Sequence, residues 1–249
     1  MEDRISNLPE NVLCHILSFL PTEDAFSTRL LSKKWLPLWL SIPCLDFDQS
    51  RSSNRLPSSN SYTQQFLDDP FTNPSKPFVS KRKFKTLSKL IRADVINVIM
   101  MHSHVPLRIF CNAEFLRVDE FWEEDVPTFP NLIHMELSLG PYCQWKSVLN
   151  MLNHCPQLQT FVLENVFRTE VWPDTHVLPE CFSLQLRKCV FIDFTGKECE
   201  MRIVKFVMQN STSLRTMKIF CKSDDLSHEE THEICSRAVI QAAGLDEVI

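Results

Sequence analysis

The chain has 249 residues, of which 44% are hydrophobic, and its formal net charge is -5 at pH 7. This length exceeds the usual size of one domain, about 100 to 200 residues, so we expect a small module followed by one larger domain. The acidic balance argues against nucleic acid as the main partner, and no apolar run reaches the roughly 18 residues of a membrane-spanning helix. Because the N-terminus lacks the basic start and apolar core of a signal peptide, we expect a soluble chain in the cytoplasm, the nucleus or both.

Three short amphipathic helices are predicted within residues 1–48. Asn7 is a favourable N-cap for the first helix, and Pro21 ends it. Thr22 is predicted to cap the second helix, and Ser32 a third one that Pro37 must shorten or bend. Together the helices carry more large apolar side chains than a free-standing unit of about forty residues can bury. A partner or a following domain must therefore cover some of them.

The order of residues in this segment resembles an F-box. A Leu-Pro pair precedes an apolar helix, a second Leu-Pro pair follows it, and Leu-Ser-Lys-Lys-Trp comes before a Leu-Trp pair, with Lys34 where many members have Arg. The resemblance implies docking onto a Skp-type adaptor and, through it, onto cullin and RING subunits. The adaptor-binding positions of the family fall on Leu8, Pro9, Leu13, Ile16, Leu17, Leu20, Pro21 and the bracing Trp35. The alternative is that these residues are merely the core of a small helical domain.

Residues 49–83 are rich in Ser, Asn, Pro and charged residues, and we predict that they form a flexible linker. Such a composition offers too little apolar surface to offset the cost of ordering the chain. The run KRKFK at 81–85 is interpreted as a solvated start of the next segment rather than as a nuclear-import patch.

Ten cysteines are spread along the chain, and none forms the CxxC pair that is usual for structural zinc. In a reducing compartment such cysteines mostly behave as small buried hydrophobes. We therefore expect no zinc site, no disulfide framework and no other cofactor.

A repeat occupies much of the remaining chain. Four strings of alternating apolar residues, separated by 26, 28 and 28 residues, begin at Leu132, Leu158, Leu186 and Leu214. The separation lies within the leucine-rich-repeat range of about 20 to 29 residues, and the alternation predicts one face of a short strand. With a weaker fifth copy, the pairs predicted to point into the core are Leu107/Ile109, Met135/Leu137, Phe161/Leu163, Cys189/Phe191 and Met217/Ile219.

Helices are predicted between the strands, because residues 145–152 and 200–210 carry apolar side chains at helical spacing. Residues 87–98 suggest a further helix before the first strand. Such units stack into a parallel sheet lined by helices, in which neighbouring repeats bury each other's faces. The expected fold class is therefore α/β, with an N-terminal three-helix F-box followed by a short leucine-rich-repeat-like stack.

The second half of the chain resembles an FBD domain, from Leu178-Pro179-Glu180-Cys181 to the string that ends at Ile219. Preceded by FPNLIHMELSLG and CPQLQTFVLENV, it resembles the plant F-box/FBD/leucine-rich-repeat family along almost the whole chain. Members commonly carry more repeats, so this array looks internally shortened, and the tail after about Asp225 departs from the usual FBD ending. The expected organisation is an F-box (1–48), a linker (49–83), a repeat segment (84–175), an FBD region (176–226) and a C-terminal helix and tail (227–249).

One enzymatic motif occurs, because residues 228–232 match HExxH, in which two His hold zinc and the Glu acts as a base. However, Ser227 and Glu230 form a capping box, which places the motif at the exposed first turn of a terminal helix. The extended metzincin spacing is missing, and the three glycines form no phosphate loop. We interpret the stretch as a surface helix and the protein as non-catalytic.

The resemblance implies a substrate-recognition subunit of an SCF-type (Skp-cullin-F-box) ubiquitin ligase that binds a target protein through its repeats and FBD region. The alternative is a decoy that binds the adaptor without delivering a substrate. Strand alternation sends one set of side chains to a concave face, where an apolar patch often marks a contact site. The predicted substrate-binding residues are Val162, Val190, Ile192, Lys218 and Phe220. A C-terminal helix with Ile234, Ala238 and Val239 that covers this patch is the alternative for that face.

Overall fold

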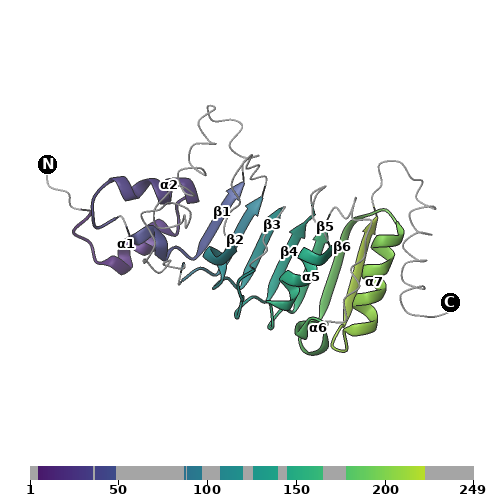
Figure 1. Ribbon diagram of the computed structural model, residues 1–249. Helices are drawn as coiled ribbons and strands as arrows, with labels where there is room; N and C mark the ends of the chain where they lie inside the picture. The colour runs from purple at the N-terminus through teal and green to yellow at the C-terminus, as the bar shows by residue number, and fades with distance from the viewer. Residues whose placement is uncertain are drawn as a thin grey trace, which may run out of the picture. The chain divides into compact units, whose positions relative to one another are not determined.

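The computed structural model describes residues 5–35, 37–48, 87, 89–96, 107–119, 126–139, 145–164 and 178–221. They belong to two units, Met1–Arg117 and Val118–Ile249, each of which combines helices with strands (Figure 1). The predicted linker, the KRKFK run, the HExxH stretch and the predicted C-terminal helix lie outside the described residues.

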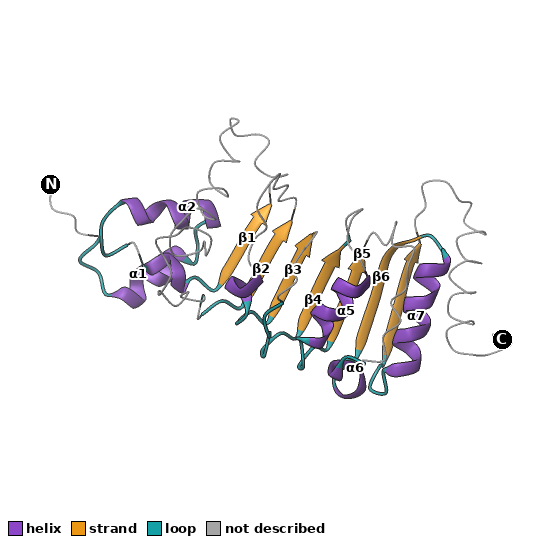
Figure 2. Ribbon diagram, viewed as in Figure 1, coloured by secondary structure: helices purple, strands orange, loops and turns teal. Residues whose placement is uncertain are grey.

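The first unit begins with two short α-helices, α1 (Glu10–Leu17) and α2 (Thr22–Ser27) (Figure 2). Each starts directly after the proline of a Leu-Pro pair, and neither has a side-chain cap, so the predicted caps are wrong. A proline suits this place because the first residues of a helix have no intrahelical acceptor for their N–H groups. The Thr22 hydroxyl instead accepts a hydrogen bond of 2.8 Å from the Asp46 N–H and so connects α2 to the following strand.

The predicted third α-helix is also wrong. In the predicted span, Ser32 to Trp39, the described residues form a turn, in which the Trp35 N–H donates to the Ser32 carbonyl, and the start of a 3-10 helix, Leu38–Ser41. Another 3-10 helix, Thr28–Leu30, precedes the span. Pro37 explains the interruption, because it lacks an N–H and its ring collides with the preceding helical turn. The aromatic rings of Phe26 and Trp39 pack edge to face, 5.1 Å apart, in the core of this segment.

Parallel strands follow in the first unit. The register of β1 (Cys44–Asp48) and β2 (Arg92–Ile96) runs from Cys44 beside Arg92 to Asp48 beside Ile96. The helix predicted over residues 87–98 is wrong, because alternate residues of β2 are buried, as in a strand. The predicted Leu107/Ile109 strand is wrong too: Leu107–Phe110 is a 3-10 helix, and the strand is β3 (Phe115–Asp119), which begins in the first unit and ends in the second.

The second unit contains a regular parallel sheet. Its strands β4 (His134–Ser138), β5 (Thr160–Glu164), β6 (Lys188–Phe194) and β7 (Thr216–Cys221) are neighbours in chain order. The register places Met135, Phe161, Cys189 and Met217 side by side, and likewise Leu137, Leu163, Phe191 and Ile219. The alignment predicted for these four repeats is therefore confirmed.

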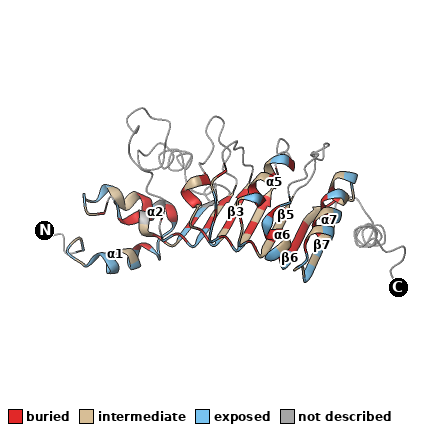
Figure 3. Ribbon diagram, turned by 60° about the horizontal axis from the view of Figure 1, so that its bottom comes forward, coloured by how far each residue is buried: buried red, intermediate tan, exposed pale blue. Residues whose placement is uncertain are grey.

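Helices α5 (Trp145–Asn153), α6 (Glu180–Leu184) and α7 (Glu198–Asn210) cover one face of this sheet (Figure 1). Along β4 to β6, the predicted inward residues are buried on that side, and the alternating pattern is visible in Figure 3. The Phe182 and Phe206 rings, 5.8 Å apart, join α6 to α7. A thiol contact of 3.7 Å from Cys181 to the Leu152 carbonyl joins α6 to α5.

Near the end of the sheet, the regular register is interrupted between Phe191 and Phe194, so that Phe194 lies beside Cys221. Asp193 has a φ of 57° at this point, a left-handed conformation that Asp tolerates better than most residues. Such a bulge bends and twists a strand. On β7, Met217 and Ile219 are only half-buried, in contrast to their buried counterparts on β4 to β6.

Candidate binding surfaces

The eight residues predicted to bind an adaptor fall into two groups in the structure. Leu13, Leu17 and Trp35 are buried, with at most 3% of their surface exposed, so they support the fold and are not open to a partner. The others are exposed or half-buried: Leu8, Pro9, Ile16, Leu20 and Pro21. The sequence interpretation therefore combined core residues with surface residues, because both sets lie on α1 at helical spacing.

Lys34 and Trp35 fix the segment that precedes α1. The Trp35 Nε1–H donates to the Ser6 hydroxyl at 2.8 Å, and the Lys34 ammonium donates to the carbonyls of Ser6 (2.5 Å) and Leu8 (2.7 Å). These bonds hold Leu8 and Pro9 at the start of α1. Trp35 thus braces this segment from the core, and Lys34 supplies hydrogen bonds at the position where many F-boxes have Arg.

Large apolar side chains remain exposed on the helical segment. We call them the apolar F-box surface: Val12, Ile16, Phe19, Leu20, Leu30 and Leu31, which are exposed by 37% to 79%. The sequence analysis counted Val12, Leu30 and Leu31 among the apolar side chains of which some need a cover, but did not assign them to the adaptor, and it did not consider Phe19. The exposure of Val12 could be predicted from its spacing, because Val12 and Ile16 form a second i, i+4 pair beside the buried pair Leu13 and Leu17. When a helix is apolar on two sides, the core of its own domain covers one side and the other side remains for a second contact.

The predicted substrate-binding residues lie on the sheet face opposite α5, α6 and α7, which we call the open face. The register places Val162 beside Val190, Val190 beside Lys218, and Glu164 beside Ile192. Val190 is almost fully covered, at 6% exposure, whereas Val162 and Ile192 are half-buried. On β7, Lys218 and Phe220 are exposed. The structure therefore brings these residues onto adjoining strands, with Val190 at the centre.

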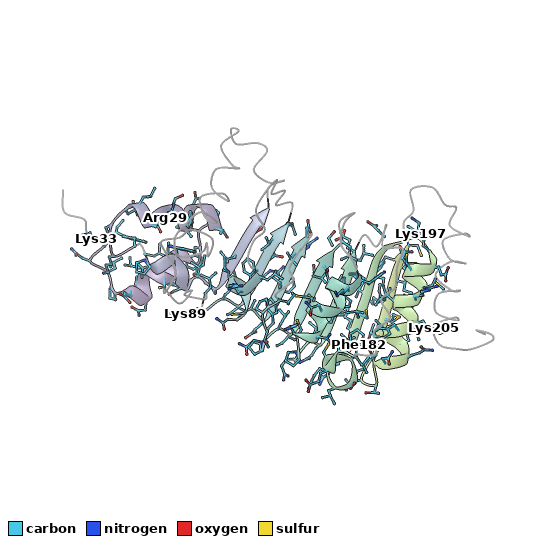
Figure 4. All side chains as sticks on the ribbon, in the orientation of Figure 1. Arg29, Lys33, Lys89, Phe182, Lys197 and Lys205 are labelled. Atoms are coloured by element: carbon cyan, nitrogen blue, oxygen red, sulfur yellow. The ribbon has the colours of Figure 1, made fainter. Side chains whose placement is uncertain are left out.

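Charge is distributed unevenly over the open face. On β4, His134 Nε2 and Glu136 Oε1 lie 2.8 Å apart, and Glu164 is the acidic residue of β5. The next two strands carry Lys188 and Lys218, both exposed. The two lysines of β6 and β7 thus lie apart from the His134–Glu136 ion pair of β4. Figure 4 shows the side chains on the ribbon.

Glu200 is a fully buried carboxylate at the start of α7. Its Oε2 accepts hydrogen bonds from the Thr195 N–H (2.9 Å), the Thr195 hydroxyl (3.0 Å) and the Lys197 N–H (3.0 Å). Burial raises the pKa of this carboxyl, and the hydrogen bonds partly oppose the increase. Gly196, in the same turn, has a φ of 75°, a left-handed conformation that glycine adopts readily. The hydrogen bonds to the Glu200 carboxylate thus hold a sharp connection between β6 and α7.

The cysteines of the second unit are mostly buried. Cys155, Cys181 and Cys189 are free thiols, and burial raises the pKa of each, that of Cys181 to about 12. Thiols with such pKa values stay protonated and are poor nucleophiles. Cys221 is an exception to the expected free thiols, because it is disulfide-bonded.

No group of three or more His, Cys, Asp or Glu side chains in the described part of the chain could hold a metal ion. No helix among these residues is both long and apolar enough to cross a membrane. The described surfaces with a recognisable chemical character are therefore the apolar F-box surface and the open face.

Comparison with known proteins agrees with this division. The F-box domain model matches residues 5–46, and the FBD model matches residues 175–219. The FBD-associated F-box protein At5g18780 of Arabidopsis thaliana is 54% identical over 67 residues, which are 27% of this chain and 15% of that protein.

Two further Arabidopsis thaliana proteins match 66% of the chain. F-box/LRR-repeat protein At4g14096 is 30% identical over 174 residues, and F-box/FBD/LRR-repeat protein At5g22700 is 28% identical over 184 residues. The matches cover 35% and 42% of these relatives, so the chain spans less than half of their length. The chain thus carries an F-box domain and an FBD domain, and its homologues are Arabidopsis proteins of the F-box, FBD and leucine-rich-repeat type.

Proposed function

We propose that the chain is the substrate-recognition subunit of an SCF-type ubiquitin ligase. In this role the F-box binds a Skp-type adaptor, which connects it to cullin and RING subunits, and the second unit binds a target protein. The protein itself is non-catalytic and works in the cytoplasm or the nucleus. The observation that carries the proposal is the apolar F-box surface, which lies within the residues that match the F-box model.

The energetic reason is the cost of leaving these side chains in water. Full burial of a leucine contributes about 1.5 to 3 kcal/mol, and Leu30 and Leu31 are exposed by 79% and 66%. Contiguous exposed apolar side chains usually mark an interaction site. Because the buried residues Leu13, Leu17 and Trp35 shape the underlying core, they contribute to adaptor binding by holding α1 in place.

The proposed target site is the open face. Its apolar and basic residues lie on three adjoining strands: Val162, Val190, Ile192, Lys218 and Phe220. A target that binds there buries apolar surface and contacts the charge of Lys218. An interface of this kind combines an apolar centre with a polar rim.

Co-purification with a Skp-type adaptor tests the proposal. Ile16→Asp with Leu20→Asp places two charges on the apolar F-box surface at half-exposed positions, so the fold should survive while adaptor binding is lost. Leu13→Asp is unsuitable, because Leu13 is fully buried and its replacement would unfold the helices.

The matched control is Leu178→Asp with Leu184→Asp, which adds the same charges at exposed apolar positions of the second unit. It should leave adaptor binding unchanged. If the folded Ile16/Leu20 variant still co-purifies with the adaptor, the proposed surface is wrong. If the wild-type chain captures the adaptor but no target is ubiquitinated, the decoy alternative is favoured.

A further inference from the structure

The open face carries two lysines that flank its apolar centre. Lys188 is two residues before Val190 on β6, and Lys218 lies directly beside Val190 on β7. Both lysines are exposed, and Val162 adjoins Val190 on the other side. A half-buried apolar residue, Val162, and the nearly covered Val190 therefore lie beside two exposed cations on β5, β6 and β7.

Neither lysine is neutralised by an acidic side chain within the described residues. The ion pairs found there join Arg92 to Asp94, His134 to Glu136 and Arg202 to Glu198. Exposed Arg187 and Arg215 stand directly before β6 and β7 and add positive charge at the same end of the sheet.

This local excess of positive charge occurs in a chain whose formal net charge is -5. Lys188 and Lys218 are not directly opposite each other in the sheet, and no described acidic side chain pairs with either of them. Electrostatic complementarity speeds association with an oppositely charged partner and excludes partners of the same charge. The charge pattern of β6 and β7 fits an acidic partner.

We propose, resting on the proposed function, that the target segment recognised by the open face is an extended acidic peptide with an adjacent apolar residue. Two of its carboxylates contact Lys188 and Lys218, and the apolar side chain covers the exposed part of Val162.

The spacing supports this occupant. Lys188 lies beside Thr216, so Lys188 and Lys218 are diagonal neighbours, for which the separation is about 7 to 8 Å. Side chains at alternate positions of an extended peptide point the same way and are about 7 Å apart. A segment with two acidic residues separated by one residue therefore matches both lysines at once.

The probe is a fluorescent peptide of about eight residues, extended enough to cross three strands, with two aspartates at alternate positions followed by leucine. Three comparison peptides replace the aspartates by asparagine, the aspartates by lysine, or the leucine by serine. Binding to the full chain is measured by fluorescence anisotropy at low and high salt. We expect only the first peptide to bind well, and its affinity to fall as salt rises.

Lys188→Glu with Lys218→Glu should weaken this binding by at least about tenfold, because charge pairs at an interface become repulsive. The matched control, Lys146→Glu with Lys205→Glu, reverses two exposed lysines on α5 and α7, on the opposite face. It should change the affinity by less than about twofold. Equal losses of peptide affinity in both variants would overturn the proposal. So would a lysine peptide that binds the wild-type chain as tightly as the aspartate peptide.

Two other occupants give different results, and either would overturn the proposal. If residues 222–249 of the chain occupy the open face, neutralising Glu229, Glu230 and Glu233 to glutamine should raise peptide affinity at least about tenfold. If a second copy occupies it, the wild-type chain should dimerise and the Lys188/Lys218 variant should not. Adaptor co-purification of every variant is the separate readout for the proposed function, since loss of peptide binding with intact adaptor binding rejects this inference alone.

Discussion

The helical segment and the repeat sheet use apolar side chains in opposite ways. The helices leave six of them exposed by 37% to 79%, whereas β4, β5 and β6 bury their inward apolar residues to 1% or less. The sheet is covered by the helices that follow its own strands, so each repeat completes the core of its neighbour. The short F-box helices have no such cover in the described chain, and this difference is the reason that we propose a partner for them.

The largest expected difference between the two regions comes from replacing one leucine in each by alanine. Leu163→Ala leaves a cavity in a close-packed core and should lower the free energy of unfolding by about 2 to 5 kcal/mol. Leu30→Ala changes an exposed residue and should alter it by no more than about 0.5 kcal/mol, while weakening adaptor binding. Urea denaturation and adaptor affinity measure the two effects. Comparable losses of stability would show that Leu30 belongs to a core.

A smaller effect on stability is expected from the hydrogen bond that connects α2 to β1. Thr22→Val keeps the shape of the side chain but removes the oxygen that accepts the Asp46 N–H, and should cost about 1 kcal/mol of unfolding free energy. Thr22→Ser retains the hydroxyl and is the control. If the serine variant is as destabilised as the valine variant, the methyl packing of Thr22 matters more than its hydrogen bond.

The smallest expected effect concerns the pH dependence of the second unit. Because burial raises the pKa of Glu200 in the folded protein, its contribution to stability is complete below the ordinary value near 4.5 and declines as pH rises through the raised pKa. Glu200→Gln cannot ionise, so its unfolding free energy should fall less between about pH 4.5 and 7 than that of the wild type.

Glu198→Gln, at an exposed position of the same helical turn, is the control for this experiment. It should follow the wild-type pH profile. Chemical denaturation at several pH values provides the measurement, and identical slopes for Glu200→Gln and the wild type would assign the pH dependence to other groups.

The sequence was sufficient to predict the repeat from Leu132 onward, including the neighbours of Phe161 and Leu163 in the sheet. Alternating apolar residues at a fixed period leave few alternatives, because a shift by one residue would expose the whole apolar face. The FBD and F-box resemblances are also confirmed by the family models.

The first unit was harder to predict. Short apolar runs fit a strand or a helix equally well, which explains why Arg92–Ile96 was expected as a helix and Leu107–Phe110 as a strand. The predicted helix caps are wrong because proline, whose side chain has no capping oxygen, occupies the N-cap position of both α1 and α2. The sequence could not separate buried from exposed residues in the predicted adaptor-binding set, because Leu13 and Ile16 share a helix and only tertiary packing decides which of them is covered.

The most direct test of the account is a calorimetric titration of the intact chain with a purified Skp-type adaptor. We expect saturation at one adaptor per chain and a negative heat-capacity change, since apolar side chains leave water on binding. The Ile16→Asp/Leu20→Asp variant, with its circular dichroism unchanged, should give no binding heat. A folded wild-type chain that shows no binding would contradict the central claim, and so would a heat-capacity change that this variant fully retains.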